Sequence, residues 1–300
     1  MAETTETNAY DTRRCENLRG ALAMLGAIAL FIINDAMIKL ASEGLPAAQT
    51  IGVRGIFATA WVLLAVTAAR QWHQAHHALD PRTMGRAALD VLSTFTYLIA
   101  LFNMPLSLAV AIGQTAPLMM LALSVMFLRE RVPWGRWVAV SVGFAAVLLV
   151  VRPAGGEVGE GLGGWAMLAL LATLFSAVRD IYTRLVPARV PSLIITMATA
   201  IAVTMTGVAL TAIQGWVPMS GRQWTLLFGA SVFLAGAYHL MIMALRHGEV
   251  SFVGGFRYAS LPAAALLGWL VWGHLPDGPP VFGMMVIVGA GLYLFRSGQR

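Results

Sequence analysis

The chain of 300 residues is 58% hydrophobic and only 11% charged, with a mean hydropathy of +0.74 and a formal net charge of +6. A soluble domain carries about 25% charged residues, so this chain has too few charges to cover a surface that faces water. The composition therefore excludes an ordinary soluble protein and predicts an integral membrane protein, since one bilayer crossing takes roughly 20 mostly apolar residues.

A polar tail over residues 1–17, which we expect to be cytoplasmic and disordered, precedes ten apolar stretches. Each stretch that crosses lipid must be a helix, because only helices and closed barrels satisfy their backbone groups there and these runs are too long for barrel strands. The predicted all-α membrane helices cover 18–41, 46–69, 84–104, 107–128, 133–151, 161–186, 191–214, 222–246, 249–273 and 278–296. The longest polar connections, 71–83 and 152–160, are predicted to be loops.

The basic residues follow the positive-inside rule when both termini are placed in the cytoplasm. Fourteen arginines then fall at cytoplasmic helix ends and loops, whereas the opposite side holds only Lys39, Arg152 and Arg222. This bias is typical of a multi-pass membrane protein and sets its orientation. The basic excess is therefore explained without nucleic acid, which we do not expect as a partner.

The second five stretches resemble a diverged copy of the first five, displaced by about 145 residues. The segment from Asp35 to Lys39 matches the segment from Asp180 to Arg184, and Ser107 matches Ser251 after a one-residue slip. Because five is an odd number of crossings, the second copy must be inverted in the membrane. Inverted repeats over 18–151 and 161–296 are typical of alternating-access carriers.

One part of the first copy resembles a known family. Pro117-Leu118, the turn Leu128-Arg129-Glu130-Arg131 and Gly135 are similar to the drug/metabolite transporter superfamily in its ten-helix EamA-type branch. The second copy keeps Pro262 but lacks the acidic turn. The resemblance, with a weaker likeness to bacterial aromatic amino acid exporters, implies a bacterial inner-membrane carrier. It also implies a central cavity lined mainly by 18–41, 84–104, 107–128, 161–186, 222–246 and 249–273, with 133–151 and 278–296 at the periphery.

Charges inside the predicted helices are candidates for gating or coupling, because charges in a bilayer are costly. Asp35 and Asp180 lie near opposite mouths of the repeat, which suggests a pair of gates or a proton site. The alternative is a stabilising ion pair within each helix, from Asp35 to Lys39 and from Asp180 to Arg184. Arg54 lies at a depth similar to that of Asp35 and is a possible second partner.

Arg257 lies near the middle of the stretch 249–273, where a guanidinium needs a partner or water. Its planar donors suit a substrate carboxylate, and a static structural pair is the alternative. Gln114 is in the matching part of the first copy. Pro117 and Pro262 are predicted helix breaks that free backbone carbonyls near the midplane.

Other polar groups are candidates to line the cavity, or else to make hydrogen bonds between helices. These residues are Asn34, Thr94, Tyr97, Tyr238, His239 and Tyr258.

These features predict a secondary transporter that exports small metabolites, with amino acids, aromatic ones included, as the expected substrates. A multidrug or other metabolite exporter of the same fold is the alternative. The only lysine is Lys39, so no Walker A motif is present, and no H-E-x-x-H or G-x-S-x-G motif indicates an enzyme. We expect no cofactor and no metal, and a small-molecule substrate and the lipid bilayer as partners. A monomer suffices because one chain holds both copies.

Overall fold

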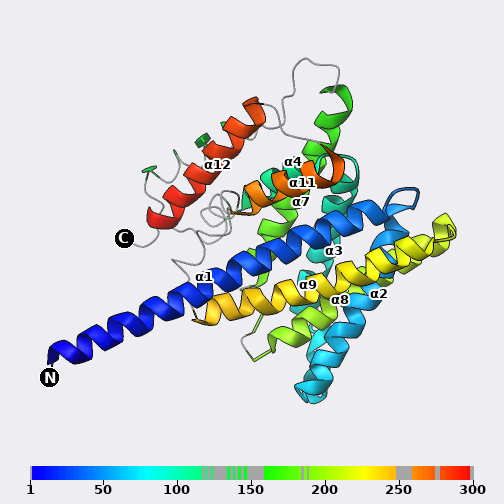
Figure 1. The fold of residues 1–300 in the computed structure, drawn as a ribbon. Helices are drawn as coiled ribbons and strands as arrows, with labels where there is room; N and C mark the ends of the chain where they lie inside the picture. The colour runs from blue at the N-terminus through cyan, green and yellow to red at the C-terminus, as the bar shows by residue number, and fades with distance from the viewer. Residues whose placement is uncertain are drawn as a thin grey trace.

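The computed structural model describes residues 2–116, 119, 123, 134–135, 138, 141–142, 145–146, 159–183, 186–187, 189–247, 259–273 and 278–297 (Figure 1). All regular elements within this part of the chain are helical. They are α1 (Ala2–Ala41), α2 (Ala47–Ala68), the 3-10 helix η1 (Trp72–Leu79), α3 (Pro81–Phe102), α4 (Leu106–Gly113), α7 (Gly159–Thr183), α8 (Ser192–Gln214), α9 (Gly221–His247), α11 (Ser260–Trp272) and α12 (Gly278–Ser297).

Six of the described helices are long and apolar enough to cross a membrane. They are Leu18–Ala41, Ala47–Ala68, Pro81–Phe102, Gly163–Thr183, Ser192–Gln214 and Gly221–Met241. These six agree with predicted stretches of the sequence, and they make the chain a multi-pass membrane protein whose described part is all-helical. Residues 117–118, 120–122 and 124–128 of the predicted stretch 107–128 lie outside the described residues, and so does most of the stretch 133–151.

Two local predictions are wrong. Residues 2–17 continue α1 as a helix, which projects beyond the bundle in Figure 1, instead of forming a disordered tail. The sequence has no proline or glycine before Gly20 to end a helix there. The predicted loop 71–83 contains η1 and the start of α3, where Pro81 takes the first helical position, which suits its fixed φ.

The bundle is built from three long helix pairs: α1 packs against α9, α3 against α7, and α2 against α8 (Figure 1). The short helices α4 and α11 pack against each other. Buried aliphatic side chains from several helices, among them Ile38, Ile51, Leu101 and Leu227, join these pairs into one core. The pairing places helices from the two ends of the chain around a common interior.

Helices α2 and α8 cross with their backbones in contact. A Cβ atom added to Gly207 would lie 2.6 Å from the Cα atom of Gly52, so neither position has room for a side chain. Close to this contact, the hydroxyl oxygens of Thr59 and Thr204 share a hydrogen bond of 2.8 Å. Small residues at a helix crossing allow this approach in membrane proteins, where packing rather than hydrophobic burial drives association.

Large apolar side chains cover the outside of the bundle. Ile213 is 81% exposed, Met205 66% and Leu270 64%. Exposed apolar surface on this scale would favour aggregation in water, but it matches a lipid environment. Several polar side chains of the spanning helices are buried instead, among them Asn34, Gln49 and Thr173.

Candidate substrate cavity

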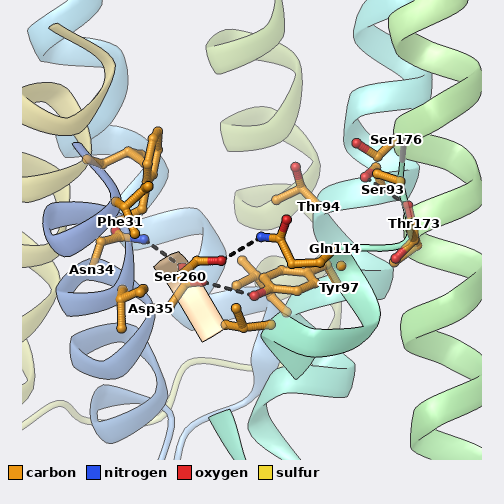
Figure 2. A pocket seen from close by; sticks show the side chains of 18 of the residues that line it. Phe31, Asn34, Asp35, Ser93, Thr94, Tyr97, Gln114, Thr173, Ser176 and Ser260 are labelled. Carbon is orange, nitrogen blue, oxygen red and sulfur yellow. Dashed lines mark hydrogen bonds between the residues drawn. The ribbon is translucent and has the colours of Figure 1, made fainter. Parts of the chain in front are cut away.

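A cavity of about 420 Å³ lies inside the bundle (Figure 2). It is within the range of roughly 300–1,000 Å³ that is usual for small-molecule sites. Its walls come from α1, α3, α4, α7, α9 and α11, as the family resemblance implied, and also from α2 through Arg54. The polar lining residues are Asn34, Asp35, Arg54, Ser93, Thr94, Tyr97, Gln114, Thr173, Ser176, Arg179, Tyr238 and Ser260.

Asp35 is held by two hydrogen bonds at the α1 wall of the cavity. The Tyr97 hydroxyl donates to its Oδ2 atom at 2.9 Å, and Asn34 Nδ2 donates to its Oδ1 atom at 2.9 Å (Figure 2). Tyr97 belongs to α3, so this contact joins two helices that are 62 residues apart in sequence. The structure therefore brings together three of the residues that the sequence singled out.

The predicted ion pair between Asp35 and Lys39 does not form. Lys39 instead points to the junction of α3 and α4, where its Nζ atom donates to the carbonyl oxygens of Leu101 at 2.6 Å and Met104 at 2.7 Å. The ammonium also lies 5.8 Å from the centroid of the Trp272 ring. Carbonyl groups at a helix C-terminus and an aromatic face both attract a cation, so these contacts replace the intrahelical partner.

Arg54 extends from α2 to the cavity and has no hydrogen bond to any described residue. Its Nε atom is buried without a partner. Asp35 attracts it electrostatically, as the sequence suggested, but the two groups form no ion pair within 4.0 Å among the described contacts. The guanidinium is thus held at the cavity with part of its donor capacity unused.

Gln114 connects the two short helices beside the cavity. Its Nε2 atom donates to the Ser260 hydroxyl at 2.6 Å, which joins the end of α4 to the start of α11 (Figure 2). Gln114 and Thr115 form a turn after α4, so the helix is interrupted just before Pro117, which itself lies outside the described residues. Pro262 is in the first turn of α11 rather than in the interior of a described helix. Its missing N–H costs little there, because the first N–H groups of a helix lack intrahelical partners.

Tyr238 and His239 separate in the structure. Tyr238 lines the cavity and packs edge-to-face against Phe31, with ring centroids 5.2 Å apart. His239 is exposed and is absent from the cavity lining. Thr94 lines the cavity as predicted. The next residue along a helix points in a different direction, which explains why only Tyr238 of the two neighbours lines the cavity, although its side chain is also 49% exposed.

A charge network that the sequence analysis missed joins α3 to α7 at one end of the cavity. Arg179 donates from Nη1 to Asp90 Oδ1 at 2.7 Å, and Arg86 donates from Nη1 to Asp90 Oδ2 at 3.3 Å. Arg86 also donates to Thr183 at 3.0 Å and to Thr199 at 2.7 Å. The four-residue spacing of Arg86 and Asp90 was a readable signal, but the link to Arg179 is purely tertiary.

Asp180 belongs to this network and not to the cavity lining. Its Oδ1 atom accepts two hydrogen bonds from the neighbouring Arg179, at 2.8 and 2.9 Å. The predicted partner Arg184 lies outside the described residues. Arg257 and Tyr258 also lie outside them, so their predicted roles remain predictions.

Comparison with known proteins places these features in a family. The model of the EamA-like transporter family matches residues 18–152 and again residues 163–296. The chain is 26% identical over 282 residues to the pseudopaline exporter CntI of Pseudomonas aeruginosa (strain UCBPP-PA14), a match that covers 93% of this chain and 96% of that protein. It is 28% identical over 285 residues to a riboflavin transporter of Vibrio cholerae, covering 90% and 91%.

Two further similarities extend this picture. An S-adenosylmethionine uptake transporter of Rickettsia prowazekii is 23% identical over 209 residues, which is 70% of this chain and 69% of that protein. A crystal structure of a protein that is 17% identical superposes with a TM-score of 0.64 and covers 95% of this chain and all of the other. The last similarity supports the fold alone.

Proposed function

We propose that this chain, which belongs to the EamA-like transporter family, is a secondary transporter. It carries a small metabolite through the cavity between its helices. The observation that carries the proposal is the cavity itself. Twelve of its lining residues are polar although the surrounding helices are apolar. Polar groups inside a membrane bundle are costly and usually mark a substrate or ion pathway.

Alternating access requires two equivalent halves, and the helix packing supports an inverted repeat. A displacement of 145 residues carries α2 onto α8, α1 onto α7 and α3 onto α9. The contact between α1 and α9 therefore has its counterpart in the contact between α7 and α3. Helices α2 and α8 are counterparts of each other, so their contact is its own counterpart. These are the three main pairs of the bundle. We therefore propose ten membrane helices with both termini in the cytoplasm of a bacterial inner membrane, and rocking of one half against the other.

In this proposal, two different sets of side-chain contacts close the two ends of the cavity. With α1 running outward, Lys39 and its carbonyl partners hold the outer ends of α1, α3 and α4 together. The network of Asp90, Arg179 and Arg86 holds the inner ends of α3 and α7 together. Alternating access then requires that these two sets of contacts open in turn. Asp35 lies between them and is the candidate proton site.

The transported molecule belongs to a broad class. The relatives are named for pseudopaline, riboflavin and S-adenosylmethionine, which favours the alternative of a general metabolite carrier over a dedicated amino acid exporter. Amino acids remain substrates to be tested. Export down a concentration gradient needs no coupling ion, whereas uptake against a gradient would need one.

Counterflow in proteoliposomes tests the proposed function. The purified full chain is reconstituted, loaded in turn with single unlabelled metabolites, and offered the same labelled compound outside, with and without a pH gradient. Saturable accumulation of at least one compound, absent from protein-free liposomes, is the expected result. If riboflavin, S-adenosylmethionine and a full panel of amino acids all fail to accumulate, the result contradicts the proposed transport of metabolites of these kinds.

A further inference from the structure

Two buried atoms at the cavity lack hydrogen-bond partners among the described residues. One is Arg54 Nε, a charged donor, and the other is Asn34 Oδ1, a neutral acceptor. Asn34 is only 2% exposed, so bulk water does not satisfy it. Leaving a buried polar atom without a partner costs about 1–3 kcal/mol, and more when the group is charged. Both atoms therefore identify positions where a bound molecule would restore a hydrogen bond.

Several charged and amide groups near these two atoms already have partners, whereas the buried Arg54 Nε and Asn34 Oδ1 have none among the described residues. Asn34 uses its amide N–H on Asp35, and Tyr97 donates to the other carboxylate oxygen. Gln114 uses its Nε2 atom to donate to Ser260. At the far end, Arg179 is neutralised by Asp90 and Asp180. A ligand thus meets one open cation at Arg54, one open acceptor at Asn34 and the negative charge of Asp35 beside it.

We propose that the cavity binds a zwitterionic head group, with a carboxylate on Arg54 and an adjacent amine on Asn34 Oδ1 and Asp35. This inference rests on the proposed transport function and names the substrate class for it. A guanidinium can receive a carboxylate through Nε and one Nη atom together, and Nε is the unpartnered atom here. The ammonium group supplies the N–H donor that Asn34 lacks and the positive charge that Asp35 attracts.

The charge balance favours a zwitterion over either ion alone. Arg54 and Asp35 carry opposite charges and face the same cavity without forming an ion pair. A substrate with only a positive charge would leave the guanidinium unsatisfied, and a substrate with only a negative charge would leave the carboxylate unbalanced in a low-dielectric interior. The remaining wall has Phe31 on one side and Ser93 and Thr173 on the other, which suits a mixed apolar and hydroxyl-bearing body (Figure 2). Tyr238 packs against Phe31 and also lines the cavity.

Matched pairs of compounds that differ only in the carboxylate test this assignment. The full chain in proteoliposomes is assayed with S-adenosylmethionine against decarboxylated S-adenosylmethionine, and with phenylalanine against phenethylamine. Riboflavin serves as a substrate without a carboxylate. In at least one pair, the wild-type protein is expected to bind the acid roughly 10- to 100-fold more tightly than the decarboxylated compound. This factor corresponds to the free energy of a hydrogen bond to a charged group.

Arg54→Gln should abolish that preference and leave the affinity for the decarboxylated partner within about twofold. Arg54→Lys keeps the charge and should restore part of the preference. Arg222→Gln removes one arginine at an exposed position of α9 and should change nothing. Asn34→Leu should weaken the binding of phenylalanine more than the binding of its deaminated analogue 3-phenylpropionate. Size-exclusion profiles of each variant exclude misfolding as the cause.

The outcomes separate the two proposals. Transport of riboflavin or of the decarboxylated compounds in preference to every acid would overturn the zwitterion site while leaving the transport function intact. Equal losses for acid and decarboxylated partners in Arg54→Gln would likewise overturn it. If no compound is transported by wild type, both proposals fail.

Discussion

The hydroxyl oxygens of Thr59 in α2 and Thr204 in α8 lie 2.8 Å apart, and the two residues are separated by 145 positions in the chain. This separation equals the displacement of the internal repeat. In an inverted repeat, a residue on the pseudo-two-fold axis meets its own counterpart, so the hydrogen bond supports an axis that passes between these two threonines. The crossing of α2 and α8 would then be the pivot between the two halves.

The contact of Gly207 with Gly52 should be intolerant of even one added methyl group. Gly207→Ala places a Cβ atom 2.6 Å from the Gly52 Cα atom, so the helices must separate. Overpacking of this kind costs about 1–3 kcal/mol, and we expect thermal unfolding in detergent, followed by tryptophan fluorescence, to shift down by several degrees. Gly164→Ala in α7 is the matched control, because nothing lies within 4 Å of its Cβ position. Equal shifts for both variants would contradict a backbone contact.

Breaking the network around Asp90 should open the cavity toward the cytoplasm. Asp90→Asn removes the shared acceptor of Arg86 and Arg179, which hold α3 against α7. Ser176 lines the cavity next to this network, so Ser176→Cys in a Cys15→Ser background reports access. We expect Asp90→Asn to raise its reaction rate with a charged thiol reagent about tenfold in inside-out vesicles, which corresponds to about 1.4 kcal/mol.

A surface carboxylate provides the control for this experiment. Asp80 pairs only locally with His77 in the described contacts, so Asp80→Asn should leave the labelling of residue 176 unchanged. An unchanged rate in Asp90→Asn would show that the network does not limit access, and its role would then be confined to stability.

The sequence was informative wherever a helix face or an apolar run decides the structure. The long apolar runs predicted the six candidate membrane-spanning helices correctly. The sequence placed Asp35 near the outer mouth as a gate or proton site, and the structure places it in the cavity wall. The partner of Asp35 was less accessible, because Tyr97 is 62 residues away. Local spacing favoured Lys39 as the partner, but two tertiary carbonyl contacts hold that ammonium elsewhere.

The network around Asp90 shows the same limit. Asp90 and Arg179 are 89 residues apart, and no periodicity in the sequence relates them. Their contact depends on the packing of α3 against α7. The internal repeat indicates this packing only after each helix has been matched to its counterpart in the other copy. Residues that reach a cavity across such an interface therefore need the fold before they can be recognised.

Lys39 should stabilise closure of the outer end of the cavity. Lys39→Met removes the two hydrogen bonds to Leu101 and Met104 while it preserves most of the side-chain volume. Ser107 lines the small pocket beside Lys39 and is buried, so Ser107→Cys without Cys15 reports opening from the outside. We expect roughly tenfold faster labelling by an impermeant maleimide in right-side-out vesicles. Lys39→Arg should keep the slow rate, and fast labelling in that variant would argue against a role for the positive charge.

The single cysteine allows the proposed orientation to be tested in the unmodified chain. Cys15 precedes the first spanning segment, which begins at Leu18, so a cytoplasmic N-terminus places its thiol inside the cell. An impermeant maleimide should therefore label the protein in inside-out vesicles and leave it unlabelled in right-side-out vesicles. Ser220→Cys combined with Cys15→Ser is the matched control, because residue 220 lies in the exposed connection between α8 and α9 and should show the opposite pattern. Labelling of Cys15 from the outside would reverse the topology, and the Lys39 contacts would then close the inner end of the cavity.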